Sequence, residues 1–175
     1  LAGERGDVIE RFIEQALSNT DARVAEDKPI TPMFLFGVFL WHAVEAQAAV
    51  LREQEDMSEH QALMIATAEM TVFQTRRISL PRRFAFPMRE MLQLQPRFEQ
   101  RSGKRAMGLL EHRRFRAAFD LMLLRASVGD VDPEVAEFWT NIQEQPVDDR
   151  RKAFGAGRRR RRSRGGRSRR PAHAQ

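Results

Sequence analysis

The residues with the clearest chemical potential are arginines that crowd the C-terminal end of the chain, separated by glycine and serine. Guanidinium groups pair with phosphate oxygens through two parallel hydrogen bonds and stack on nucleic-acid bases. Glycine and serine leave the backbone free to follow an irregular strand. The pattern predicts binding to a polyanion without readout of base sequence, and the alternative is a solubilising tail with no specific partner. The arginines expected to make these contacts are Arg158, Arg159, Arg160, Arg161, Arg162, Arg164 and Arg167.

A second basic block spans residues 76–125, which hold 13 Arg and Lys against four Asp and Glu. Several of its cations fall where helices are expected to begin, and the helix dipole disfavours a cation there. Because helix N-termini are themselves anion sites, this mismatch predicts an anionic partner. The alternative is internal pairing with the acidic stretches 1–75 and 126–149. The candidate binding residues of this block are Arg82, Arg83, Arg101, Lys104, Arg105, Arg113, Arg114 and Arg116.

Signals for catalysis or metal binding are weak. Asp130 and Asp132 form an Asp-x-Asp pair of the kind that holds Mg²⁺ for nucleotidyl transfer, but no Gly-Ser turn precedes it. Asp132 is better placed as a helix cap. His42, His60, His112 and His173 lack metal-ligand spacing, and His42 is expected to be a core residue of an apolar helix. The sequence therefore predicts no catalytic residue, no cofactor site and no metal site in this chain.

Helices must position these residues, because hydrophobic side chains recur at helical spacing and strand-like alternation is missing. Ser58 and Gln61 have the spacing of a capping box, and Pro96 is expected to kink or interrupt its helix. The sequence predicts an all-α fold, an irregular bundle of about six or seven helices over 1–149, followed by a disordered arginine-rich tail over 150–175. The expected helices cover 7–17, 31–52, 58–73, 87–101, 104–110, 113–128 and 133–142.

Composition narrows the class of protein. The chain has no cysteine, which excludes disulfides and thiolate metal sites and fits a reducing cytoplasm. The longest apolar run, Met33 to Trp41, is about half of what a membrane helix needs, so a core helix and no membrane partner are expected. The residues after Leu1 do not form a signal peptide, and this start suggests a cut inside a longer polypeptide.

Several segments together resemble the bacterial poly(A) polymerase I family. The matching runs, in chain order, are Phe12–Gln15, Asn19–Asp21, Thr31–Phe36, Ile78–Phe84 and Ser102–Leu121, the last of which contains GKRA, LLEH and FRAA. The arginine-rich end matches as well, so the similarity covers nearly the whole chain. Arg113 stands directly after Leu-Leu-Glu-His, where the family tends to have proline.

The resemblance implies an enzyme that adds adenylates from ATP to RNA 3′ ends. It implies a catalytic head, with ATP and Mg²⁺, that precedes the region matched here and does not lie in this chain. The chain itself would be the helical RNA-binding body and arginine-rich arm, inactive alone. By this resemblance the partners are RNA and, as a further possibility, RNA-decay proteins, in the cytoplasm.

Two other functions fit the residues. The first is a protein-interaction module whose basic tail recruits acidic partners. Competition between RNA and an acidic protein would separate it from an RNA-binding body. The second is a self-contained enzyme that uses Asp130 and Asp132, for which incubation with labelled ATP, Mg²⁺ and RNA is the test, and no product is expected.

Overall fold

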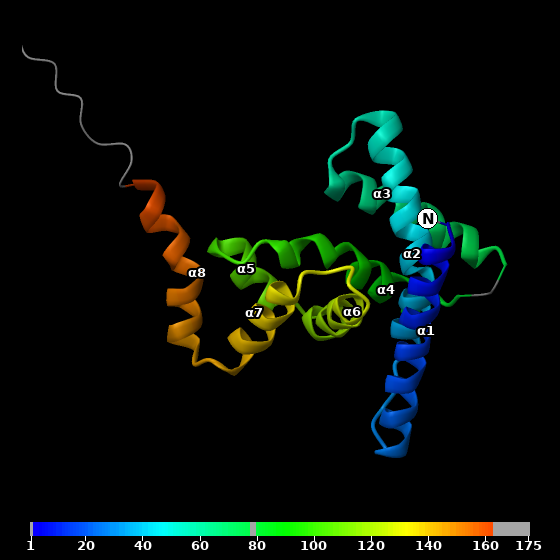
Figure 1. Cartoon of the computed structure of the whole chain (residues 1–175), viewed down its shortest axis with the longest axis horizontal. Helices are drawn as coiled ribbons and strands as arrows, with labels where there is room; N and C mark the ends of the chain where they lie inside the picture. The colour runs from blue at the N-terminus through cyan, green and yellow to red at the C-terminus, as the bar shows by residue number, and fades with distance from the viewer. Residues whose placement is uncertain (1, 78–79, 163–175) are drawn as a thin grey trace, which may run out of the picture.

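The computed structural model describes residues 2–77 and 80–162, with side chains from 5 to 77 and from 80 to 155. Within these ranges the chain is helical and has no strand, which confirms the all-α prediction (Figure 1). The described part contains one more α-helix than the seven at most that were expected. The elements are α1 (Ala2–Ala25), α2 (Pro32–Glu55), α3 (Glu59–Thr75), α4 (Arg82–Gln93), the 3₁₀ helix η1 (Gln95–Glu99), α5 (Gly103–Leu110), α6 (Phe115–Ser127), α7 (Pro133–Glu144) and α8 (Val147–Arg162).

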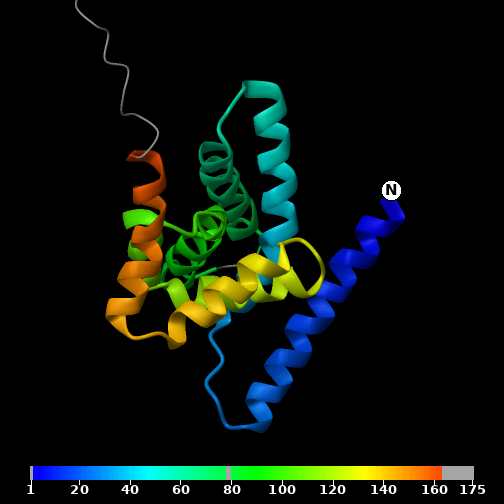
Figure 2. The same ribbon diagram turned by 60° about the vertical axis from the view of Figure 1, so that its left-hand side comes forward.

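Helix α2 is the centre of the body. It contacts α1, α3, α4 and α6, and it buries residues along its whole length, from Met33 to Leu51 (Figures 1 and 2). At Gly37, helix α2 lies so close to α4 that a Cβ would overlap the terminal methyl group of Met91. By length and hydropathy α2 is also the one helix among the described residues that would suit a membrane span, a test that a core helix passes as well.

The two helix caps predicted from the sequence, at Ser58 and Asp132, are confirmed. The Ser58 hydroxyl accepts a hydrogen bond from the Gln61 backbone N–H, and the Gln61 side chain accepts one from the Ser58 N–H. Asp132 accepts a hydrogen bond from the Glu134 N–H at 2.8 Å and so caps α7. Asp132 is therefore used as a cap, and its pairing with Asp130 across one metal ion is not supported.

Two helix boundaries differ from the prediction. Helix α1 continues past the expected stop at 19–21, and the chain turns only at Asp27, whose φ is 54°. The Thr20 hydroxyl donates to the Ala16 carbonyl oxygen at 2.8 Å, so this polar residue stays within the helix. Helix α4 begins five residues before Pro87, which lies inside it because the helix is held by the buried Met88, Met91 and Leu92.

The expected helix 87–101 is divided, as Pro96 suggested. Helix α4 ends at Gln93, and Pro96 lies in the first turn of η1. Proline suits the start of a helical segment because its missing N–H would have no partner there. The break turns the chain toward α5, and it buries Phe98 of η1 in the core.

Helix α8 is the largest departure, because disorder was expected from residue 150 onward. The helix starts at Val147 and packs against α5, which Figures 1 and 2 show as neighbours. Phe154 is 3% exposed and lies between the rings of Phe138 and Trp139, with centroids 6.2 and 6.1 Å away. One aromatic residue thus anchors a segment whose composition alone would not fold. The predicted disorder of 163–175 lies outside the described residues.

Candidate nucleic-acid interface

The start of α5 presents two cations beside free backbone N–H groups. Lys104 and Arg105 are exposed in the first turn, which contains no acidic residue. Ser102 caps the helix without a side-chain hydrogen bond, and Gly103 has the positive φ of 80° that lets the chain enter the helix there. The buried Ala106 and Leu109 fix the helix underneath. This arrangement suits an anion such as a phosphate group.

The start of α4 combines guanidinium groups with aromatic rings. Arg82 and Arg83 are exposed in a first turn without acidic residues, and the Arg83 guanidinium carbon lies 4.9 Å from the centroid of the Phe84 ring. Phe86, one turn further on, is 61% exposed. A basic surface with open aromatic faces is what single-stranded nucleic acid stacks on. The sequence prediction named the arginines but missed Phe86 as a surface residue.

The last turn of α3 repeats this combination. The guanidinium carbon of Arg77 lies 4.3 Å from the centroid of the Phe73 ring, and Phe73 is 46% exposed. An exposed phenylalanine cannot be distinguished from a buried one by periodicity alone, because the side of the helix that faces the core depends on its neighbours.

The turn between α5 and α6 is different, because its arginines are paired inside the molecule. Arg113 and Arg114 both contact the carboxylate of Glu90 on α4, with Arg114 Nε 3.1 Å from Oε2. Partial burial acts to raise the pKa of Glu90, but the two guanidinium hydrogen bonds outweigh it and leave this pKa lowered. These pairs fix the turn, in which Arg113 occupies the position after Leu-Leu-Glu-His.

His112 completes this turn. Its Nδ1 accepts a hydrogen bond from the Arg114 backbone N–H at 3.1 Å. Burial lowers the pKa of His112, and the nearby Arg97 lowers it further. A neutral imidazole among three arginines marks a positive local potential, which an approaching anion would reduce.

Two more of the predicted residues also have carboxylate partners. Arg116 lies 3.0 Å from Asp120 one helical turn away, and Arg101 lies 3.7 Å from Glu134. Burial raises the pKa of Asp120 in spite of Arg116. By contrast, no ion pair joins Arg82, Arg83, Lys104 or Arg105 to a carboxylate in the described part of the chain. The eight mid-chain residues therefore divide equally into paired and unpaired cations.

A cavity of 610 Å³ lies between α1, the loop before α2 and α6. Four arginines line it, Arg23, Arg113, Arg114 and Arg116, together with the carboxylate of Asp120, and Met33 and Phe34 contribute apolar surface. Even in their ion pairs, Arg113 and Arg116 are 70% and 73% exposed, so their free N–H groups remain accessible. The cavity suits a partly apolar, anionic ligand.

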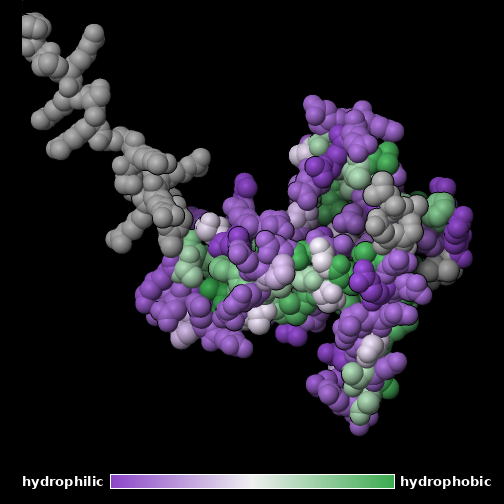
Figure 3. Space-filling view, in the orientation of Figure 1, coloured by the Kyte–Doolittle hydropathy of each residue, from purple (hydrophilic) through white to green (hydrophobic). Residues whose placement is uncertain are grey.

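The unpaired cations lie at the starts of two separate helices. In Figure 1 the label of α4 stands near the centre, beside α2, whereas α5 and α8 are at the left. The face shown in Figure 3 is hydrophilic over most of its outer part, and hydrophobic residues gather in its middle. The predicted site is therefore not a single patch. The backbone of Arg158–Arg162 forms the end of α8, while their side chains, and Arg164 and Arg167, lie outside the described residues.

The sequence of this chain matches a known protein family and several curated relatives. Residues 55–173 match the family model of the polymerase A arginine-rich C-terminus. Poly(A) polymerase I of Escherichia coli O6:H1 is 40% identical over 126 residues, which are 71% of this chain and 27% of that protein. The enzyme of the same name from Salmonella typhi is 35% identical over 143 residues, covering 80% of this chain and 31% of the relative.

A third relative comes from another bacterial genus. Poly(A) polymerase I of Haemophilus influenzae is 35% identical over 135 residues, 77% of this chain and 30% of its own length. The chain thus spans less than a third of the length of the curated relatives it matches. The family model covers well over half of the chain, including α3 to α8. The chain therefore belongs to the family of the polymerase A arginine-rich C-terminus.

Proposed function

We propose that this chain is the RNA-binding body of a polyadenylating enzyme that adds adenylates from ATP to RNA 3′ ends. The observation that carries the proposal is the set of four exposed cations, unpaired among the described residues, at the starts of α4 and α5. In this proposal the body holds RNA phosphates, and ATP and Mg²⁺ bind to a catalytic head elsewhere in the polypeptide. The body alone is inactive.

The two helix starts would hold the strand in different ways. At α5, the backbone N–H groups of the first turn and the charges of Lys104 and Arg105 act on a phosphate. At α4, Arg82 and Arg83 act on phosphates while Phe86 gives a base a ring to stack on. Neither arrangement distinguishes one base edge from another, so the contacts position the strand and add little sequence preference.

Helix α8 determines where the arginine-rich arm leaves the body. Phe154 and the contacts with α5 fix the point from which the arm leaves the body. The backbone of Arg158 to Arg162 continues α8, the helix that packs against α5. This neighbourhood supports a continuous phosphate track from α5 to the arm, in which the arm increases affinity and the body sets the position.

The test is the binding of a 5′-labelled 20-nucleotide oligoadenylate, followed by fluorescence anisotropy over a range of salt concentrations. One variant replaces Arg82, Arg83, Lys104 and Arg105 by alanine. The control removes the same charge from four exposed positions elsewhere, by alanine at Arg5, Arg11, Lys28 and Arg52. If each site residue neutralises one phosphate, the slope of log K against log salt falls by roughly 3 in the site variant.

The control variant should keep most of the slope. Equal losses in both variants would mean that binding follows net charge and that the two helix starts have no special role. If an acidic protein saturates the chain and oligoadenylate does not displace it, the chain is a protein-interaction module instead.

A further inference from the structure

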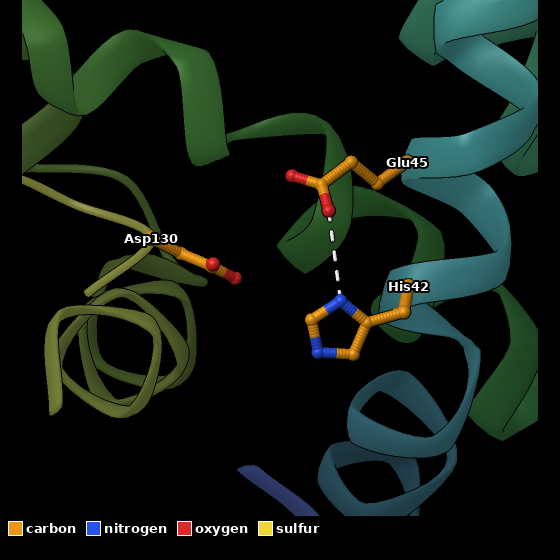
Figure 4. Close-up of side chains that lie close together, drawn as sticks. All are labelled: His42, Glu45 and Asp130. Carbon is orange, nitrogen blue, oxygen red and sulfur yellow. Dashed lines mark ion pairs between the residues drawn. The ribbon is translucent and has the colours of Figure 1, made fainter. Parts of the chain in front are cut away.

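Three side chains of metal-ligand type meet at a place that the proposed RNA contacts do not use. His42 and Glu45 lie one turn apart on α2, and Asp130 comes from the loop between α6 and α7 (Figure 4). One donor atom from each lies within 4.8 Å of the other two. His42 Nδ1 and Glu45 Oε2 are 3.5 Å apart. Sequence spacing among the histidines missed this group, since two of its members are carboxylates and one is distant in the chain.

The imidazole of His42 is held in place but incompletely bonded. Its side chain is only 10% exposed, and the Phe12 ring packs against it edge-on with centroids 4.7 Å apart. Its Nε2 is buried and has no hydrogen-bond partner. Its Nδ1 lies 3.5 Å from Glu45 Oε2, which is longer than a well-formed hydrogen bond. Both atoms are of metal-ligand type, and they are close enough to share one ion.

The charges around the group leave one carboxylate without a counter-ion. Arg125 lies over the Trp41 ring, and its Nη2 is 3.9 Å from Glu45 Oε1, on the oxygen that does not face His42. No ion pair reaches Asp130 in the described part of the chain. Arg125 therefore neutralises one of two facing carboxylates, and the second is unbalanced.

We propose that His42, Glu45 and Asp130 bind a divalent transition-metal ion of the Zn²⁺ type, which ties α2 to the loop before α7. One imidazole and two carboxylates are ligands that such ions accept, and three protein ligands leave a fourth position for water. A tetrahedral ion at about 2.1 Å from its ligands holds them roughly 3.4 Å apart. The His42–Glu45 separation already fits, and a small movement of the Asp130 loop would complete the site.

The test is isothermal titration of the EDTA-treated chain with ZnSO₄, together with a thermal melt. We expect one strong site per chain, a higher melting temperature with Zn²⁺, and a nitrogen and oxygen coordination shell by X-ray absorption. Asp130→Asn and His42→Gln should each weaken the strong site by at least about tenfold. Asp132→Asn and His60→Gln are the controls, since Asp132 caps α7 and His60 is exposed, and both should keep the site.

The two ligand variants lie in different elements, so a loss of Zn²⁺ binding can be separated from a loss of folding. Asp130 lies in a loop, so its asparagine variant should keep the far-ultraviolet circular dichroism of the helices even if His42→Gln loses it. The proposal is overturned if Zn²⁺ binds no more tightly to the unaltered chain than to the Asp130→Asn variant. In that case the group is an ion-pair cluster centred on Arg125. RNA binding by the four cations would be unaffected by that result, so the two proposals fail independently.

Discussion

Trp139 donates its indole N–H to the main-chain carbonyl oxygen of Phe98 at 2.7 Å, and the two rings also meet edge-on with centroids 5.3 Å apart. Both residues are buried, and they join α7 to η1. Phe115 of α6 and Phe154 of α8 pack onto the same indole. Four elements of the C-terminal half, η1, α6, α7 and α8, are therefore held by one aromatic cluster, defined by Phe98, Phe115, Phe138, Trp139 and Phe154.

Replacing Trp139 by phenylalanine should expose the dependence of the body on this bond. The change keeps an aromatic ring but leaves the Phe98 carbonyl without its partner in the core. We expect the free energy of unfolding, measured with urea, to fall by about 1–3 kcal/mol more than in Trp41→Phe. Trp41 is a matched control because its buried indole N–H has no partner. Equal losses would show that lost volume alone matters.

Phe154→Ala should release α8 without unfolding the body. Phe154 is the buried anchor of a helix that otherwise consists mainly of charged residues. Hydrogen exchange should become faster in the amides of residues 150–155 and remain unchanged in α2 and α4. Phe86→Ala, which alters a 61% exposed ring, should leave α8 protected. Faster exchange throughout the chain would instead mean that α8 supports the whole core.

Glu90 should contribute stability that disappears in acid. Its folded pKa lies below the ordinary value of 4.5, so the contribution is complete above about pH 4.5 and is lost as pH falls through the lowered folded pKa. Glu90→Gln should flatten that part of the pH profile of urea unfolding. Each partly exposed pair is worth about 0.2–1 kcal/mol, so the total effect should be small. An unchanged acid profile would mean that Arg113 and Arg114 find other partners.

His112 should respond to an anion near the α5–α6 turn. Its folded pKa is below the ordinary value of 6.5, so the folded state loses stability as pH falls below about 6.5, where the unfolded chain takes up the proton first. Bound phosphate near Arg113 and Arg114 would raise this pKa. An NMR titration of the His112 ring with and without oligoadenylate measures the change, with the exposed His60 as reference. An unchanged pKa for His112 would mean that the RNA held by the starts of α4 and α5 does not reach this turn.

Local signals allowed several elements to be predicted from the sequence. The capping box at Ser58 and the cap at Asp132 involve residues two or three positions apart, and both were correct. Helix α5 was expected over 104–110 and begins at Gly103, one residue earlier. These features depend on hydrogen bonds within one turn of chain, which a sequence displays directly.

Features that depend on distant partners could not be predicted in this way. The pairing of Arg113 and Arg114 with Glu90 joins positions 23 and 24 residues apart, and charge counts cannot tell which cations find such partners. The order of α8 required an aromatic cluster that exists only after η1, α6 and α7 have packed. The meeting of His42 with Asp130 likewise depends on how α6 lies against α2.

The absence of a side chain at Gly37 brings the central helix close to α4, the helix that carries Arg82 and Arg83 at its other end. A Cβ at position 37 would overlap only the terminal methyl group of Met91, whereas the nearest atoms of Met88 and Leu92 lie at ordinary contact distance, 3.6 Å away. Because that methyl group is the far end of a flexible side chain, alanine at position 37 would be accommodated by a rotation of Met91 within the core. The seam between the two helices therefore tolerates a small increase in volume, and an unbranched, adaptable side chain supplies that tolerance.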